Sequence, residues 1–571
     1  MYQKDKRIKR PVNSCMTVLL IIFLGPSILS LPFGFIFATY DAFKKGNIFQ
    51  GFLLLAVTTA VFYGAYKLYL IYRGKNKGRD KKNIKSTPNS VELATKGGKI
   101  IMNNPFRGFF VVGAAGSGKS ESIAVPLLNQ FINKGYSGIV YDFKFPTLAN
   151  DVQTFLDASK SDLKHFYLNF NNPYQSHRVN PLRPEYLVTT SYAREYAQAI
   201  ISNLMKESIQ KPDFWSRSAT DLLTACIWYL KEERPDICDL PHVCAMITSN
   251  DTALLELLQT NVQTEQMTIS IYNAMKRGAE GQTSGVIGSL QGAIAQINTP
   301  ELMYIFGGND FSLDINNPSN PILLTVGSYP TLTTTFAPLC SLVITVGTKL
   351  MNQPNKKQSF VLLDEAPTVF IPNIEILPNT GRSNKIATVL MCQDLAQLTD
   401  GYGKEKADVL FASCNNHFYG RVASSKTSEI LSKQFGKQDR TFITASRGGK
   451  HLEVSKNYNR SESTQERDVI KPSEFLDLNV GEFAGITVES NYPKFKKQFL
   501  QIKRPEFNGL SKITNKSDVS SYYRQVREDV RQMLSRFETT SRNGSKTAIL
   551  NHTQTNSLKG DKNNTFDLIG D

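Results

Sequence analysis

Cysteine and histidine are scarce in this chain, and neither is spaced for metal binding. The 571 residues include 7 cysteines and 6 histidines, with no C-x-x-C pair and no H-E-x-x-H motif. Closely spaced cysteines or histidines are the usual signature of a zinc site. Their absence argues against structural zinc and predicts free thiols in a reducing compartment.

Net charge is also absent from the long central part of the chain, although the whole chain carries +16. Residues 1–99 hold 17 Lys or Arg and 4 Asp or Glu, and residues 511–571 hold 10 and 7. Residues 100–510 keep the remaining 39 of each sign and sum to zero. The basic balance is therefore no evidence for a DNA-binding central region, although a neutral total leaves room for a locally basic surface.

Two mostly apolar stretches stand near the N-terminus, at about residues 15–40 and 48–72. Each is long enough to cross about 30 Å of hydrocarbon, so a two-helix transmembrane anchor is expected over residues 1–75. A signal peptide is the competing interpretation for the first stretch. The second stretch and the lack of a small-residue cleavage pattern argue against it.

Basic residues flank both apolar stretches, whereas only a few residues separate them. The flanking residues are Lys4, Lys6, Arg7, Lys9 and Arg10 before the first, and Arg73, Lys75, Lys77, Arg79, Lys81, Lys82 and Lys85 after the second. Because positive flanks stay in the cytoplasm, both ends of the anchor are predicted to be cytoplasmic. The same runs fit lipid-headgroup contacts better than a DNA site. Residues 76–99 are predicted to form a polar linker.

A glycine-rich turn follows the apolar strand predicted at residues 109–112. It matches G-x-x-x-x-G-K-[ST] with Gly113, Ala114, Ala115, Gly116, Ser117, Gly118, Lys119 and Ser120. Glycines accept the positive φ angles that turn N–H groups inward, and the helix predicted over residues 120–134 adds its dipole. We therefore expect a nucleotide-phosphate site, with Lys119 on the β and γ phosphates and Ser120 on Mg²⁺. An ordinary glycine turn is the alternative.

An acidic pair ends a second apolar run, SFVLLDE, at Asp364 and Glu365. On a strand next to the phosphate loop, Asp364 would accept a hydrogen bond from a Mg²⁺-bound water or from Ser120. Glu365 would polarise the attacking water. Alone, the pattern fits a solvated turn equally well, but its place after a complete phosphate loop favours the hydrolytic role.

The remaining pattern predicts an α/β fold, a nucleotide-binding domain with a mostly parallel sheet and an inserted all-α domain. Further strands are expected at residues 100–102, 138–141, 321–326, 387–391 and 417–422, and helices at 191–204, 216–230, 252–260 and 285–297. The expected boundaries are residues 100–180 and 301–504 for the two parts of the nucleotide-binding domain, 181–300 for the all-α domain and 505–571 for the tail.

Two polar residues flank the strand predicted at residues 387–391. Gln393 ends it and could sense the γ-phosphate, while Arg382 precedes it and could reach into a neighbouring subunit's site. From the residues alone, an exposed loop arginine is the simpler interpretation of Arg382.

The tail outside these motifs carries apolar residues at helical spacing between Val519 and Phe537, which predicts one amphipathic helix followed by disorder. Packing of that helix on a ring of subunits is one interpretation, and recruitment of a substrate or accessory protein is the other.

Several separated motifs, in one order, resemble the type IV secretion coupling proteins of the TraG/TraD kind, relatives of the FtsK-like translocases. The resemblance runs from residue 15 to about residue 503. It rests on the double anchor and on GAAGSGKS at 113–120, YDFK at 141–144, RVNPL at 178–182, FWSRSA at 214–219, VLLDEAP at 361–367, GRSNKIATVLMCQDLAQL at 381–398 and ERDVIKPSEFLDL at 466–478.

The resemblance implies a RecA-like nucleotide-binding domain in a hexameric ATPase at the bacterial inner membrane that uses ATP and Mg²⁺. It would collect a relaxase bound to single-stranded DNA and hand it to the secretion channel in conjugation. By motif position, Lys119 and Ser120 bind nucleotide and Mg²⁺, and Asp364 and Glu365 form the hydrolytic pair. Arg382 is the arginine finger that acts in the site of the neighbouring subunit, and Gln393 is the coupling sensor.

One motif departs from the family, because D-P-K-G-E is replaced here by DFKFP at residues 142–146. Two other functions are compatible with the same residues. One is a membrane docking receptor for secreted proteins in which nucleotide acts as a switch. The other is a motor with different cargo, protein effectors or double-stranded DNA.

Overall fold

The computed structural model describes residues 84–448, 457–511, 513 and 518–537, with scattered residues between 38 and 67. The chain divides into two compact units, Met1–Lys81 and Lys82–Asp571. Most of the two predicted membrane spans lies outside the described residues. The residues that are described between 38 and 67 are helical apart from one turn.

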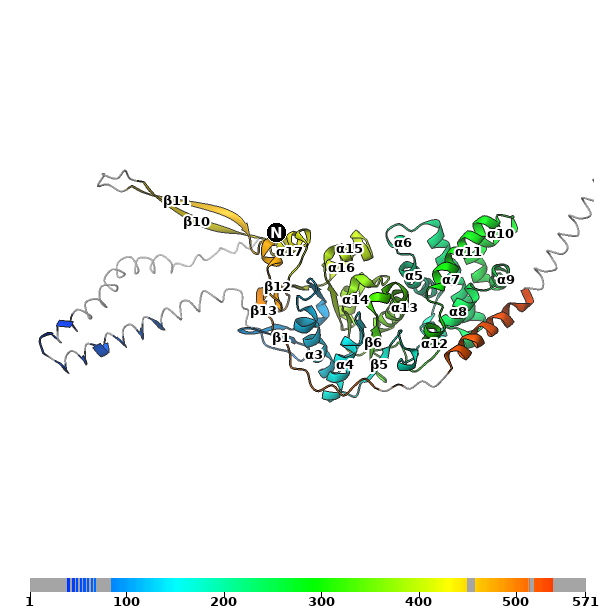
Figure 1. The fold of residues 1–571 in the computed structure, drawn as a ribbon, viewed down its shortest axis with the longest axis horizontal. Helices are drawn as coiled ribbons and strands as arrows, with labels where there is room; N and C mark the ends of the chain where they lie inside the picture. The colour runs from blue at the N-terminus through cyan, green and yellow to red at the C-terminus, as the bar shows by residue number, and fades with distance from the viewer. Residues whose placement is uncertain are drawn as a thin grey trace, which may run out of the picture. The chain divides into compact units, whose positions relative to one another are not determined.

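A nine-stranded sheet forms the centre of the second unit (Figure 1). In spatial order its strands are β13 (Lys494–Gln498), β12 (Glu482–Ile486), β9 (Asn416–Tyr419), β3 (Phe109–Val112), β8 (Ile386–Cys392), β7 (Ser359–Leu363), β4 (Ser137–Asp142), β6 (Ile322–Gly327) and β5 (Lys164–Leu168). From β9 to β5 all neighbours are parallel, whereas β12 and β13 pair antiparallel. The predicted α/β class is confirmed, with a mixed edge that the sequence pattern did not indicate.

The central strands are apolar on both faces because helices cover the sheet on both sides. Along β3, Phe110 and Val112 belong to one buried cluster, while Phe109 and Val111 belong to another. This alternation follows from the two-residue period of a strand, which sends successive side chains to opposite faces. Every residue of β3 is therefore buried, and the phosphate loop begins from a rigid base.

The helices fall into two groups. Those that cover the sheet are α3 (Val125–Asn133), α4 (Thr147–Ala158), α13 (Thr333–Met351), α14 (Leu377–Ser383), α15 (Leu395–Tyr402), α16 (Lys404–Ser413), α17 (Ser425–Phe435) and α18 (Pro472–Leu476). A helical region follows β5 and consists of α5 (Thr190–Leu204), α6 (Glu207–Gln210), α7 (Phe214–Glu233), α8 (Leu240–Ile247), α9 (Asp251–Leu258), α10 (Val262–Lys276), α11 (Glu280–Ala295) and α12 (Pro300–Phe306).

Three local expectations need correction. The strand β7 does not neighbour β3, because β8 lies between them. The helix after the phosphate loop is not continuous, since a π-helical turn at Ser120–Ala124 precedes α3. The predicted linker contains β1 (Val91–Thr95), which pairs with β2 (Gly98–Met102). In addition, the antiparallel pair of β10 (Lys437–Gly448) and β11 (Asn457–Asp468) was not predicted from the sequence.

Among the described residues, one helix is long and apolar enough to cross a membrane, at Pro330–Met351. Of its apolar window, 72% is buried inside the protein. It contains α13, which packs against α5 and β6. Its apolar composition thus serves the protein core.

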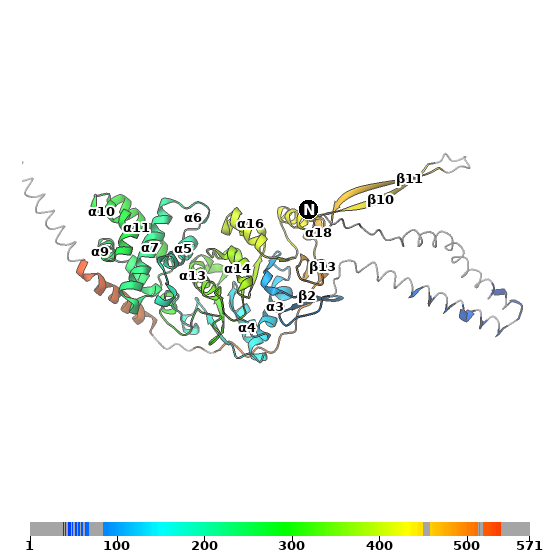
Figure 2. The ribbon, with the colours of Figure 1, turned by 180° about the vertical axis from the view of Figure 1, so that it is seen from behind.

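The tail helix, residues 519–537, packs on the helical region (Figure 2). Its residues Val526, Val530 and Leu534 are almost fully buried. The ring of Tyr522 meets Tyr304 edge-on at 5.9 Å. The amphipathic pattern predicted for this segment is confirmed, with its apolar side against the chain's own helices.

Close packing of the tail helix gives a first prediction, for Gly307→Ala. A Cβ at Gly307 would lie 1.6 Å from the Tyr522 hydroxyl oxygen and 2.2 Å from its ring carbon Cζ, so the ring must move. We expect the tail helix to detach and limited proteolysis to cleave it several-fold faster. In the control, Gly288→Ala, the new methyl group meets nothing within 4 Å. Wild-type protection in Gly307→Ala would contradict this packing.

Candidate nucleotide-phosphate site

The phosphate loop runs from the end of β3 into the π-helical turn, and its glycines are required by geometry. Gly116 and Gly118 have φ angles of 74° and 89°, a region that residues with a Cβ rarely adopt. A Cβ at Gly113 would lie 2.6 Å from the Ser117 hydroxyl. The loop therefore needs glycine at these positions, whereas the cradle of inward N–H groups around a phosphate stays a prediction.

A segment far along the chain braces this loop. Gly481, just before β12, donates its N–H to the Ser117 carbonyl at 2.9 Å. A Cβ at Gly118 would lie 3.0 Å from the Gly481 nitrogen. Sequence reasoning missed Gly481, because a lone glycine before a short strand carries no recognisable motif.

Lys119 lies inside the site, with only 9% of its surface exposed. Its ammonium donates a hydrogen bond to the Gly113 carbonyl, across the mouth of the loop. Burial lowers the pKa of Lys119, and the carboxylates of Glu365 and Asp364 oppose that shift. The side chain thus provides a partly desolvated positive charge where polyphosphate would bind.

Ser120 and Asp364 meet although 244 positions separate them. The Ser120 hydroxyl donates to Asp364 Oδ1 at 3.3 Å. Burial raises the pKa of Asp364, while Lys119 and Ser120 lower it. Paired oxygen donors suit Mg²⁺, which takes few protein ligands and completes its shell with water and phosphate. No cluster of three or more His, Cys, Asp or Glu side chains suited to a metal occurs in the described part of the chain.

Glu365 is fixed by Gln393 at the end of β8. Its two carboxylate oxygens accept one hydrogen bond from the Gln393 backbone N–H and one from the side-chain amide, both 3.1 Å. Burial raises the pKa of Glu365, and Lys119 followed by Gln393 lowers it. The insertion of β8 between β3 and β7 therefore places Gln393 beside Glu365, a contact that the sequence pattern did not indicate. The role of Gln393 as a γ-phosphate sensor stays a prediction.

Arg382 is the one predicted site residue that the structure does not bring to this cluster. It is exposed on α14, before the amino end of β8, whereas the phosphate site lies at the carboxyl ends of β3 and β7. Within the described residues its side chain has no ion-pair partner. It therefore lies at the opposite edge of the sheet from the site of its own chain.

Two further charged residues support the site from outside. Arg504 donates to both oxygens of Glu121, at 2.7 and 2.8 Å, and also to Asp151, which ties the turn after the phosphate loop to α4. Asp142, at the end of β4, accepts from the backbone N–H groups of Lys144 and Ala149. Burial raises the pKa of Asp142 to about 7.

Comparison with known proteins gives one family and a set of similar folds. The family described as "Type IV secretory system Conjugative DNA transfer" matches residues 71–527. No curated protein matches the chain.

The similar folds include a bacterial conjugative coupling protein, TrwBdeltaN70, in an unbound monoclinic form. It is 17% identical with a TM-score of 0.57, over 74% of this chain and 92% of that one. The plasmid coupling protein TrwB in complex with ADP and Mg²⁺ is 18% identical with a TM-score of 0.55, over 71% and 87%. Its complex with the ATP analogue ADPNP is 15% identical with the same TM-score, over 72% and 89%. At such identities the likeness shows a shared RecA-like α/β fold.

Proposed function

The chain belongs to the type IV secretory conjugative DNA-transfer family, and we propose that it is a membrane-anchored coupling protein in which ATP hydrolysis drives DNA transfer. Its cargo would be a relaxase bound to single-stranded DNA, passed to the components of the secretion channel. The observation that carries the proposal is the convergence of Lys119, Ser120, Asp364, Glu365 and Gln393 at one edge of the sheet.

The roles follow from what each group can do at its position. The inward N–H groups of residues 113–120 and the Lys119 ammonium hold the β and γ phosphates. Ser120 and Asp364 would hold Mg²⁺, which neutralises phosphate charge when bound. The carboxylate of Glu365 orients and polarises the attacking water. Gln393 keeps that carboxylate in place and can act as a sensor of the γ-phosphate. The TrwB complexes with ADP and Mg²⁺ and with ADPNP support nucleotide as the ligand.

Arg382 has a role in this scheme only if subunits assemble. We assign it to the nucleotide site of a neighbouring subunit in a homohexamer, because it is exposed and remote from the site of its own chain. An arginine supplied from a neighbour stabilises the charge that develops during phosphoryl transfer.

Attachment to the inner membrane is supported by the described residues of the first unit. Apart from one turn they are helical, and large apolar side chains among them are exposed, with Phe49 at 84%, Phe52 at 61% and Leu53 at 58%. Exposed apolar side chains on a helix fit a lipid environment. With basic residues on both outer flanks, this supports a multi-pass anchor with the bulk of the chain in the cytoplasm.

The hydrolytic pair predicts separable losses. Glu365→Gln should keep ATP binding but lower kcat about 10²-fold or more, because it removes the base and keeps the shape. Lys119→Ala should weaken ATP binding itself. Fluorescent-nucleotide binding and phosphate release from the full-length protein measure the two effects. Glu301→Gln, at an exposed position of α12, is the matched control. A wild-type kcat for ATP hydrolysis in Glu365→Gln would contradict the ATPase proposal.

The contacts of Gln393 predict a shift in pH dependence. Because hydrogen bonds from Gln393 lower the pKa of Glu365, Gln393→Leu should raise it. Hydrolysis needs the carboxylate, so the acidic limb of the kcat profile should move to higher pH. Gln397→Leu, at an exposed position of α15, should leave the profile in place. An unmoved acidic limb, whatever the change in amplitude, would show that Glu365 is not the titrating base.

The position of Arg382 predicts complementation between subunits. Arg382→Ala and Lys119→Ala proteins should each be inactive alone. Mixed, they should regain part of the ATPase activity, because some interfaces then combine an intact phosphate loop with an intact arginine. Activity is measured against mixing ratio, and a flat curve would count against an arginine acting across the interface.

A further inference from the structure

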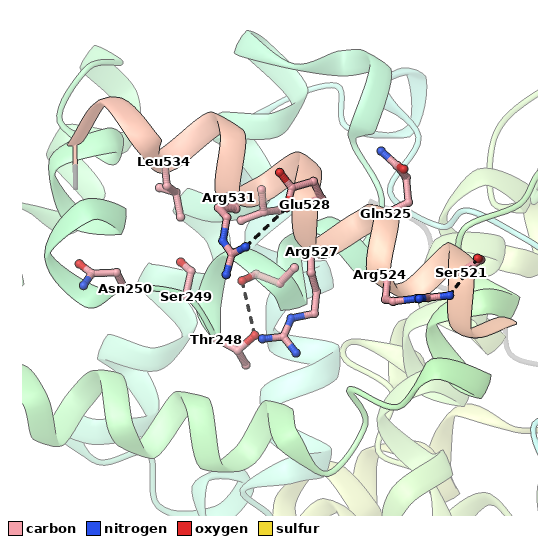
Figure 3. Close-up of a pocket in the computed structure, with 12 residues that line it drawn as sticks. Thr248, Ser249, Asn250, Ser521, Arg524, Gln525, Arg527, Glu528, Arg531 and Leu534 are labelled. Atoms are coloured by element: carbon pink, nitrogen blue, oxygen red, sulfur yellow. Dashed lines mark hydrogen bonds and ion pairs between the residues drawn. The ribbon is translucent and has the colours of Figure 1, made fainter. Parts of the chain in front are cut away.

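A cavity of about 810 Å³ lies far from the phosphate site, between the tail helix and the loop that joins α8 to α9. Figure 3 shows Arg527 and Arg531 projecting from the tail helix toward the side of the cavity formed by Thr248 and Ser249. Its apolar lining residues are Val530 and Leu534 of the tail helix and Ala245 of α8. It is therefore a polar recess over the contact that holds the tail helix in place.

The arginines of this recess form one row. Arg524, Arg527 and Arg531 are spaced by three and four positions, so they share a face of the helix. Neither Arg524 nor Arg527 has an ion-pair partner among the described residues. Arg531 is 3.7 Å from Glu528, with both side chains well exposed. A surplus of positive charge therefore faces the cavity, and it would be complementary to an anionic ligand.

The rest of the lining indicates the kind of anion. Among the residues that the structure describes, no aromatic ring lines this cavity, nor a second one of about 850 Å³ that shares Thr248, Ser249 and Asn250 with it. Single-stranded nucleic acid is normally held by stacking of its bases on aromatic side chains. Hydroxyl and amide groups here suit a polypeptide main chain instead.

The second cavity adds room for a main chain. Gly288 and Gly292 of α11 line it, and a Cβ at either would meet nothing within 4 Å. Its one carboxylate, Asp251, already accepts a hydrogen bond from Gln291 at 2.8 Å. Thr248, Ser249 and Asn250, which line both cavities, form a shared rim. A peptide that crosses this rim from the arginine row would therefore meet an open surface at the two glycines.

We propose that the arginine row and the shared rim form a docking groove for an extended acidic segment of a partner protein. In an extended peptide, side chains on one side recur about every 7 Å. The arginines step by about 4.5 and 6 Å along the helix, and their long side chains can span the difference. The inference rests on the proposed function in one respect. If the chain is a coupling protein, the acidic segment belongs to a protein that binds its helical region.

Fluorescence anisotropy with the purified full-length chain tests this groove. The probe is a labelled peptide of alternating glutamate and serine, and its partner control is alternating glutamine and serine. We expect saturable, salt-sensitive binding of the acidic peptide alone. Changing Arg524 and Arg527 together to Gln should weaken it about threefold to tenfold, and changing both to Glu should weaken it further.

A matched pair keeps the test specific. Lys211→Glu with Arg277→Glu makes the same change in net charge as the double Glu variant. These exposed residues directly follow α6 and α10 and line neither cavity. It should leave peptide binding unchanged. Equal loss in this control, or no binding of the acidic peptide by the wild type, would overturn the proposal. So would tighter binding of labelled oligothymidylate that depends on Arg524 and Arg527.

Failure here is distinguishable from failure of the ATPase proposal. The arginine variants should keep wild-type ATP binding and the same thermal unfolding midpoint, because their side chains are exposed and remote from the phosphate loop. Lys119→Ala, in turn, should keep peptide binding. Loss of the peptide with nucleotide binding intact in the arginine variants supports the groove, and parallel loss of both ligands contradicts it.

Discussion

Parallel pairing of β3, β8 and β7 is the constraint on which the site depends. Because the three strands run in one direction, the phosphate loop, Gln393 and the pair Asp364 and Glu365 emerge at the same edge of the sheet. Burial on both faces fixes that direction and register, since a slip of one residue would turn apolar side chains toward the wrong helices. The short contacts of the site are a consequence of this packing.

The parts of the site predicted correctly from sequence are those whose chemistry is local. The strand Phe109–Val112 and the loop through Ser120 were predicted at the observed positions, because the pattern itself dictates the turn. The order of strands was not, since β8 follows β7 in sequence yet pairs with both β7 and β3. Gly481 and Arg504 had no local signal at all. Their roles depend on contacts with residues hundreds of positions away.

Charge was informative only once the fold was known. Residues 511–571 carry a modest surplus, and the middle of the chain carries none, so counting assigned no binding surface to either. Helical spacing places Arg524, Arg527 and Arg531 on one face, and packing of the opposite face against the helical region leaves them exposed beside the cavity. The local electrostatic potential can thus be strong where the net charge of the surrounding segment is small.

One apolar cluster contains Val112 of β3, Tyr196 of α5 and Leu534 of the tail helix. The sheet that holds the nucleotide residues and the helices that form the groove are therefore not separate bodies joined by a hinge. They share one interior, and rearranging either part repacks the other. Linkage then imposes reciprocity. A groove ligand that favours one packing of this interior changes nucleotide affinity, and nucleotide changes the affinity for that ligand by the same factor.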